Sequence, residues 1–101
     1  MISYNLSIKI DPKIENDWIQ WVKQEYLPAI VQTGLFKDQK FHRLLYQDER
    51  DGITFIIQLS ADSIENYKNY LKKFSSTFQK KMSERWKHQF VSFHTVMEIV
   101  N

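Results

Sequence analysis

The stretch ISYNLSIKIDP, at residues 2–12, decides the fold of this chain. Apolar and polar residues alternate without a break from Ile2 to Ile10, which is typical of a strand with one apolar and one polar face. Pro12 cannot donate a hydrogen bond to a neighbouring strand, but proline is tolerated in the first turn of a helix. The pattern therefore predicts a strand over residues 2–10 that ends where a helix begins.

The next segment, residues 13–32, changes to a helical period. Ile14, Trp18, Trp21 and Val22 lie four, seven and eight residues apart from the first, which places them in one stripe of a helix. Pro28 lies inside the segment and predicts a kink, because its ring would collide with the carbonyl of the residue four positions earlier. A glycine follows at position 34, where a helix commonly ends.

Two strands and a short hairpin loop follow this helix. Residues 36–48 and 53–60 read as strands, and the loop between them is Asp48-Glu49-Arg50-Asp51-Gly52. Asp62 with Glu65 three residues later resembles a capping box, which predicts the start of a second helix. The apolar stripe of that helix is Ile64, Tyr67, Leu71, Phe74, Phe78 and Met82.

The end of the chain completes the element order. A break in the second helix is predicted near Ser75-Ser76, whose hydroxyls compete for backbone partners. Residues 90–100 then predict a fourth strand. Its more apolar side, which we expect to face the helices, carries Val91, Phe93, Thr95, Met97 and Ile99.

The order βαββαβ predicts an α+β protein of the ferredoxin-like type. Residues 1–101 have room for one domain and contain no linker. Right-handed crossovers place both helices on one face of a four-stranded antiparallel sheet. The expected spatial order is strand four, one, three, two, with the apolar strand faces turned toward the helices.

Composition excludes several classes of protein. The chain has no cysteine, so it can form neither a disulfide nor a thiolate metal site, and we expect a cytoplasmic location. No signal peptide and no apolar run of membrane-spanning length is visible, which predicts no membrane partner.

Positive charge is concentrated in one segment: seven of the fourteen Lys and Arg residues lie between Asp62 and His88. This cluster indicates a solvated helix face, with a phosphate-binding face as the alternative.

The face of the sheet without helices carries the functional information. A mixture of amides, hydroxyls, histidine and apolar groups is typical of the wall of a semi-polar cavity, although an ordinary exposed sheet face is the alternative. Strand two contributes either His42, Leu44 and Tyr46 or Phe41, Arg43 and Leu45, depending on its register. The residues expected to bind a ligand there are Asn5, Ser7, His42, Gln58, Ser92 and His94.

Catalytic and metal sites are weighed on the same face. The three histidines have no metal-ligand spacing, so we expect no metal site and no cofactor. His94, with Glu98 on the same face and Tyr46 as a second acid–base group, is the best candidate for proton transfer. The alternative is a histidine that is hydrogen-bonded at a dimer interface. Trp18, Trp21 and Tyr26 could line the mouth of a pocket, but aromatic residues at helical spacing usually belong to the core.

RNA-recognition domains share this topology and stack bases on exposed aromatic residues of strands one and three. Here the aromatic residues of those strands, Tyr4 and Phe55, belong to the helix-facing side. Residues 53–60 contain neither a glycine nor a basic residue. We therefore expect no nucleic-acid partner.

Five short blocks carry a resemblance that runs over essentially the whole chain. They are ISYN at 2–5, WIQW at 18–21, EYLP at 25–28, TGLF at 33–36 and FVSFHT at 90–95. In order and spacing they resemble the small bacterial family called domain of unknown function 4286. Two positions depart from that family's pattern: Tyr26, where relatives often have His, and His94, where they often have Arg. At Tyr26 an unperturbed phenol, with a pKa near ~10, would be a poor replacement for a catalytic histidine near neutral pH.

The resemblance implies membership of the dimeric α+β barrel group, in which two sheets pack face to face. That group includes cofactor-independent monooxygenases, muconolactone-type isomerases, haem-binding members and stress proteins. Our prediction is an uncharacterised cytoplasmic homodimer that binds a small amphipathic or aromatic molecule between its sheets. The alternatives are a structural or regulatory dimer without a ligand, and a cofactor-independent monooxygenase or isomerase.

Overall fold

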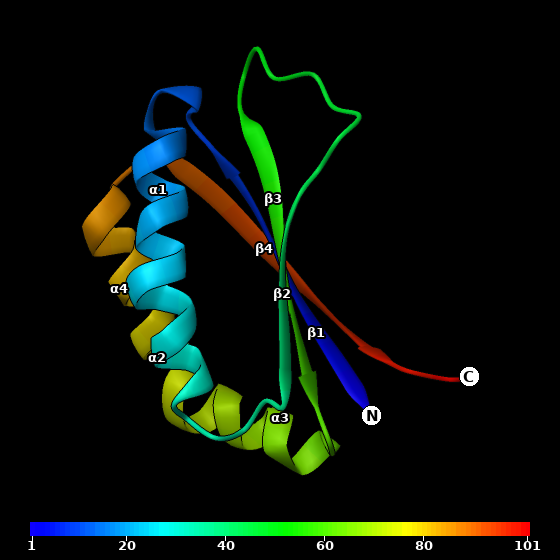
Figure 1. Cartoon of the computed structure of the whole chain (residues 1–101). Coiled ribbons are helices and arrows are strands. Elements are labelled where there is room, and N and C mark those ends of the chain that lie inside the picture. The colour runs from blue at the N-terminus through cyan, green and yellow to red at the C-terminus, as the bar shows by residue number, and fades with distance from the viewer.

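A computed structural model describes all residues from Met1 to Asn101. It contains one four-stranded antiparallel sheet in the order β2-β3-β1-β4, with all helices on one face (Figure 1). The predicted ferredoxin-like α+β fold and strand order are confirmed. The elements are β1 Ile2–Ile10, a 3-10 turn Pro12–Ile14, α1 Glu15–Trp21, a π-helical turn Val22–Tyr26, α2 Leu27–Val31, β2 Asp38–Arg43, β3 Ile53–Ala61, α3 Ile64–Tyr70, a π-helical turn Leu71–Ser75, α4 Ser76–Trp86 and β4 Phe90–Glu98.

The core lies between the sheet and the helices and is rich in aromatic rings. Tyr4 of β1 packs against Tyr67 and Tyr70, with ring centroids 5.2 and 5.7 Å apart. Trp18 of α1 lies 5.0 Å from the ring of Phe55 on β3. Rings of this size bury large apolar areas, so a chain of this length fills one core without metal or disulfide.

Both long helices contain a wider π-helical turn in place of the predicted kink and break. The N–H of Leu27 donates to the carbonyl of Val22, five residues back, and this extra residue gives the ring of Pro28 room. The second such turn ends at Ser75, so the helix continues through the predicted break.

The apolar residues of both helices explain why the turns widen. They recur every fourth residue, at Ile14, Trp18, Val22, Tyr26 and Ile30 and again at Tyr70, Phe74, Phe78, Met82 and Trp86. A spacing of four drifts by ~40° per step around an α-helix, because four residues exceed one turn of 3.6. One surplus residue in a turn cancels most of that drift and keeps each set against the sheet.

One of two predicted helix ends differs from the sequence expectation in detail. Ser63, rather than Asp62, caps α3, because its hydroxyl accepts a hydrogen bond from the Asn66 N–H at 3.2 Å. Asp62 instead pairs with Lys37 at 3.1 Å. Gly34 has a φ of 75°, as expected of a glycine that follows a helix.

The second strand is shorter than predicted and the loop after it is longer. Strand pairing stops at Arg43, and residues 44–52 form the loop at the top of Figure 1. Gln47 replaces the missing ladder: its side chain donates to the Leu44 carbonyl and accepts from the Thr54 N–H. Arg43 adds two hydrogen bonds to Glu49 and one to Glu15, so side chains rather than strand pairing hold this loop.

The face assignment predicted for the fourth strand is wrong. His94 lies opposite Leu6 and Ser92 opposite Ile8, and residues directly opposite in an antiparallel pair share a face. Because Leu6 and Ile8 face the helices, Ser92, His94, Val96 and Glu98 face them too. The more apolar residues Val91, Phe93, Thr95 and Met97 point to the other side.

None of the helices has the length and hydropathy needed to cross a membrane.

Candidate functional site: a pocket between β4 and α4

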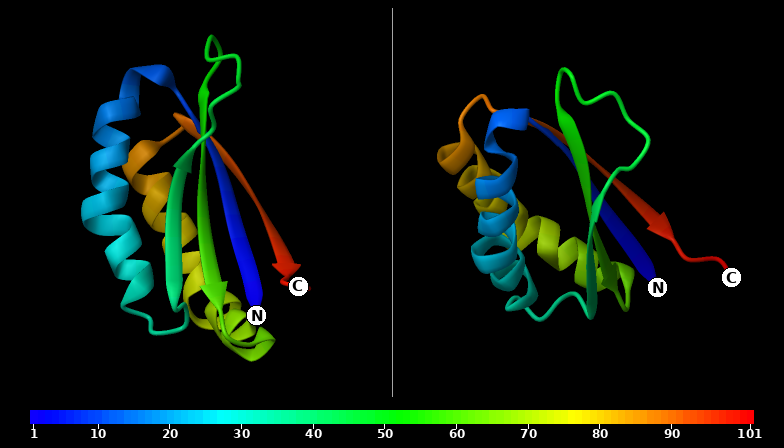
Figure 2. Two further views of the ribbon diagram at one scale, coloured as in Figure 1. Left: turned by 45° about the vertical axis from the view of Figure 1, so that its right-hand side comes forward. Right: turned by 45° about the horizontal axis from the view of Figure 1, so that its top comes forward.

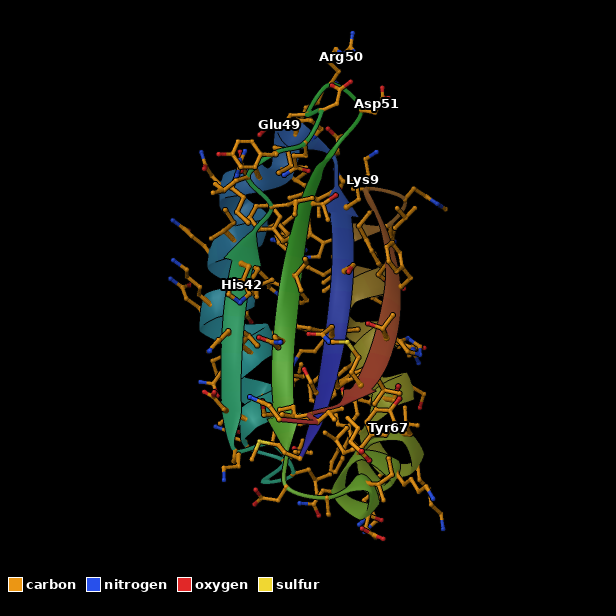
Figure 3. The ribbon with its side chains drawn as sticks, turned by 90° about the vertical axis from the view of Figure 1, so that its right-hand side faces the viewer. Lys9, His42, Glu49, Arg50, Asp51 and Tyr67 are labelled. Carbon is orange, nitrogen blue, oxygen red and sulfur yellow. The ribbon has the colours of Figure 1, made fainter.

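The register divides the six predicted ligand-binding residues between the two faces of the sheet. Asn5, Ser7, His42 and Gln58 lie on the face without helices, which Figure 3 shows from the front. His42 is paired with Ile56, which settles the register of β2 in favour of the first alternative. Ser92 and His94 lie on the opposite face. One chain therefore does not bring the six residues into one site.

We call the side of the sheet without helices the open face. Near one end of it the Ser3 hydroxyl accepts hydrogen bonds from Gln58 at 3.3 Å and from Asn5 at 3.4 Å. A hollow of about 380 Å³ lies at that end, lined by Met1, Ser3, Asp38, Lys40, Gln58, Ser60, Met97 and Ile99. Beside these polar groups, β4 exposes Val91, Phe93 and Met97 by 63%, 65% and 49%. The open face is thus polar over the central strands and apolar along β4.

A deeper pocket of about 510 Å³ lies on the helix side, between β4, β1 and α4. Figure 2 shows the course of the strand: β4 starts beside the helices and its far end runs away from them. Six of the ten lining residues are hydrophobic. The lining residues are Leu6, Ile8, Tyr26, Gln79, Met82, Ser83, Phe90, Ser92, His94 and also Phe93, although the strand register turns the Phe93 side chain toward the other face.

Polar groups from three elements meet in this pocket. β4 supplies Ser92 and His94, α4 supplies Gln79 and Ser83, and the π-helical turn supplies Tyr26. The imidazole of His94 packs against the ring of Tyr4, with centroids 5.7 Å apart. The pocket therefore combines an apolar floor with a few convergent polar groups, as small-molecule sites do.

Tyr26 is the residue of the pocket lining whose pKa is shifted most. Tyr26 is only 4% exposed, and its hydroxyl forms no hydrogen bond with another residue, but this oxygen is still reached by water, unlike the enclosed and unpaired indole N–H groups of Trp18 and Trp86. Burial, reinforced by the neighbouring phenol of Tyr4, raises the pKa of Tyr26 far above its ordinary value. Burial and the Tyr67 phenol likewise raise the pKa of Tyr4 to about 12. Both phenols are therefore neutral hydrogen-bond donors at physiological pH.

The predicted acid–base pair is not assembled within one chain. Tyr46 is 96% exposed in the loop after β2, whereas His94 lies on β4 at the opposite edge of the sheet. Glu98 shares the helix side with His94 but lies opposite Ile2, beyond the lining of the pocket. Trp18 and Trp21 are buried in the core, whereas Tyr26 does line a pocket. The structure groups no three His, Asp or Glu side chains in a way that suits a metal ion.

The comparisons with known proteins support the fold and the family. The family described as a domain of unknown function, DUF4286, matches residues 1–100. The chain belongs to this family. No curated protein matches the chain.

Solved structures with quite different titles share the fold. One is titled an antibiotic biosynthesis monooxygenase, with 12% identity, 100% of each chain covered and a TM-score of 0.67. A dimeric ferredoxin-like protein from an uncultured marine organism has 14% identity, a TM-score of 0.66 and coverage of 99% of this chain and 94% of its own. A hydroxynitrile lyase from Passiflora edulis has 14% identity, a TM-score of 0.65 and coverage of 99% and 96%. At identities this low, the structural similarity establishes the fold of the DUF4286 chain alone. Its activity has to be argued from the residues of its own site.

Proposed function

We propose that this DUF4286 protein is a homodimer joined through the open face, and that each subunit binds a small aromatic or amphipathic molecule in the pocket between β4 and α4. The observation that carries the binding proposal is Tyr26, which is only 4% exposed, lies in the lining of a largely apolar pocket together with His94 and Ser92, and has no hydrogen bond from its hydroxyl to another residue. A cytoplasmic location is part of the proposal and rests on composition alone.

The dimer is supported by the orientation of β4. Burying apolar surface away from water is favourable by about 25 cal/mol per Å². Phe93 and Val91 nevertheless point away from their own core and are mostly exposed in one chain. A second copy seated on the open face would cover them. Two solved structures that share this fold are titled dimeric ferredoxin-like proteins, which adds support by analogy.

The pocket supports binding through its size and chemistry. A volume of about 510 Å³ falls within the range typical of small-molecule sites, roughly 300–1,000 Å³. The proposal therefore puts the ligand on the helix side, whereas the sequence suggested a site between the sheets. Asn5, Ser7, His42 and Gln58 then belong to the subunit interface, where polar groups set the register of the two copies.

Two measurements test the proposal. Sedimentation at micromolar concentration is expected to show a dimer, which Phe93→Asp dissociates while Tyr46→Asp, at a more exposed aromatic position in the loop after β2, does not. A wild-type chain that sediments as a monomer would refute the dimer.

The pocket is tested by titrating the ¹⁵N-labelled protein with naphthalene and following amide chemical shifts. Shifts are expected around Leu6, Met82 and Phe90. Met82→Trp, which fills the pocket, should abolish them, and Met97→Trp on the open face should not. Shifts confined to residues of the open face, or none at all, would refute the pocket as a binding site and leave the structural or regulatory dimer.

A second candidate function, proton transfer in a cofactor-independent isomerase or monooxygenase, is favoured by one observation. The same pocket holds His94, which can accept a proton, and Tyr26, whose neutral hydroxyl can donate a hydrogen bond to the carbonyl oxygen of a developing enolate. Acid–base catalysis of this kind would accelerate exchange of the methyl protons of 2-acetylnaphthalene with D₂O. We expect His94→Ala to remove that acceleration. Exchange at the uncatalysed rate in the wild-type protein would exclude this candidate.

A further inference from the structure

The lining of the pocket carries no acidic and no strongly basic side chain. Its polar members are two serines, one glutamine, one tyrosine and one histidine. A charged ligand moved from water into such surroundings would lose its hydration without gaining an opposite charge, and this penalty is large. The pocket therefore discriminates against ions before any specific contact is considered.

The Tyr26 hydroxyl is a hydrogen-bond donor for which no other residue of the chain provides an acceptor. Its phenol is buried and remains protonated, because burial disfavours the phenolate. Since no other residue accepts a hydrogen bond from this hydroxyl, a ligand atom in the pocket that accepts it would take the place of water. The unpaired group thus specifies the complementary group on the ligand, a hydrogen-bond acceptor.

Two further phenols keep this end of the pocket neutral. Tyr4 and Tyr70 are each 2% exposed, and each interacts electrostatically with Tyr26. Burial raises the pKa of both, so neither contributes a charge to Tyr26 at physiological pH. His94 packs on the ring of Tyr4, which fixes the imidazole at the same end. Tyr4 and Tyr70 do not line the pocket themselves, but they place no phenolate charge beside the Tyr26 and His94 that do.

Resting on the proposed function, we infer that the pocket selects uncharged aromatic molecules that carry a carbonyl oxygen, and that the Tyr26 hydroxyl is the donor that recognises this oxygen. The aromatic part of the ligand would lie on Leu6, Ile8 and Met82. Tyr26 is then a specificity-determining residue, and molecules that differ only in their polar group are separated by it.

A rival occupant is suggested by the adjoining surface. A smaller hollow of about 280 Å³ shares Ser83 and Phe90 with the pocket and carries Lys87 and His88. An aromatic acid could place its carboxylate there, beside the ammonium group of Lys87. Such a ligand would leave the Tyr26 hydroxyl unpaired, which is why the neutral carbonyl compound fits the observations better.

Three probes of one size separate these cases: naphthalene, 2-acetylnaphthalene and 2-naphthoate, titrated into the full chain at about pH 8, where histidines are mostly uncharged. We expect the ketone to bind about tenfold tighter than either other probe, since one hydrogen bond to a buried donor changes affinity by roughly that factor. Tyr26→Phe should reduce ketone affinity about tenfold and leave naphthalene unchanged. Tyr67→Phe, at a buried tyrosine outside the pocket, and Lys87→Ala should alter neither.

Each contrary result overturns a different statement. Naphthoate binding as tightly as the ketone, and weakened by Lys87→Ala, would replace the neutral ligand class with an aromatic acid. Ketone binding that is indifferent to Tyr26→Phe would remove Tyr26 as the recognising donor. Failure of all three probes, naphthalene included, would refute the binding function itself. Thermal melts of each variant, followed by circular dichroism, establish that it is folded.

Discussion

Strands β3 and β4 have the same length and a similar alternation of residues, but they differ in how much of each strand is buried. Both are nine residues long, and in β3 every second residue is buried. In β4 every residue except Phe90 is exposed. The difference teaches that alternation marks a face that will be covered, but not the layer that covers it.

The positions of the two strands explain this difference. β3 lies between β2 and β1, under the helices, so its apolar side enters the chain's own core. β4 pairs only with β1 and diverges from the helices along its length (Figure 2). Its helix side carries Ser92 and His94, which line a pocket, and its apolar side points to the open face. Under the proposed function, this apolar side of the edge strand belongs to the interface with a second copy of the chain.

The largest difference in stability is expected between two substitutions that each remove one aromatic ring, one on the helix side of the sheet and one on the open face. Trp18 has no exposed surface and packs between Phe41 and Phe55. Trp18→Ala should therefore lower the free energy of unfolding by about 3–5 kcal/mol. Phe93→Ala should change it by less than about 0.5 kcal/mol in the monomer. Urea unfolding at low protein concentration measures both. Equal losses would mean that Phe93 packs into its own core, and the comparison would fail.

The next effect comes from alkaline pH, which acts on the helix side alone. An unfolded tyrosine loses its proton near ~10, whereas folded Tyr4 keeps its proton up to about 12. Between these values the unfolded state binds fewer protons, so the free energy of unfolding falls as pH rises. Below pH ~10 this contribution is constant.

The slope is at most about 1.4 kcal/mol per pH unit for Tyr4, and less where water reaches the hydroxyl through the pocket. Urea unfolding at several pH values should show this decline. Tyr4→Phe should make the decline shallower without removing it, because Tyr26 and Tyr70 also have raised pKa values, while Tyr46→Phe, at a fully exposed loop position, should not change it. A slope unchanged by Tyr4→Phe would show that other groups cause the alkaline loss.

A smaller effect distinguishes the two sides of β4 itself. Val96 faces the helices and Met97 the open face, and their exposures in one chain, 44% and 49%, are similar. If the open face is the dimer interface, Met97→Ser should weaken dimerisation about tenfold, as loss of one buried apolar contact does. Val96→Ser should leave it unchanged. Sedimentation at graded concentrations gives both dissociation constants, and equal values would place the interface elsewhere.

The smallest effect is expected at the other edge strand. Arg43 holds the loop after β2 through Glu15 and Glu49, but these groups are exposed, and exposed ion pairs contribute little to stability. Arg43→Gln should leave the melting temperature unchanged while chymotrypsin cleaves faster after Tyr46. A large fall in melting temperature would show that this edge, unlike β4, depends on its ion pairs.

The central elements could be predicted from sequence because pattern and burial agree there. The alternation of residues 2–10 and 53–60, and the helical stripes, gave the strand order correctly. The prediction failed where it assumed that the apolar side of β4 faces the helices, since the pairing of His94 with Leu6 is not encoded in residues 90–98 alone. The end of β2 was missed because Gln47 replaces ladder hydrogen bonds with side-chain ones.

The candidate site was only half visible in the sequence. His94 and Ser92 were identified, but on the wrong face, and Gln79 and Ser83 were not identified because polar residues on α4 resemble any solvated helix surface. Tyr26 was assigned mainly to the core. The strict spacing of four from Ile14 to Ile30 was the available signal, since it requires a wider turn just where Tyr26 lies.

That wider turn makes the orientation of one hydroxyl depend on a backbone residue count. Lys23 and Gln24 lie in it with their side chains in water, and neither touches the pocket. Deleting either one would rewind the segment as a regular α-helix and swing every later side chain by ~100°. Tyr26 would then leave the cavity although its own codon was untouched. Length changes in this surface stretch are thus a route by which ligand preference can diverge among relatives.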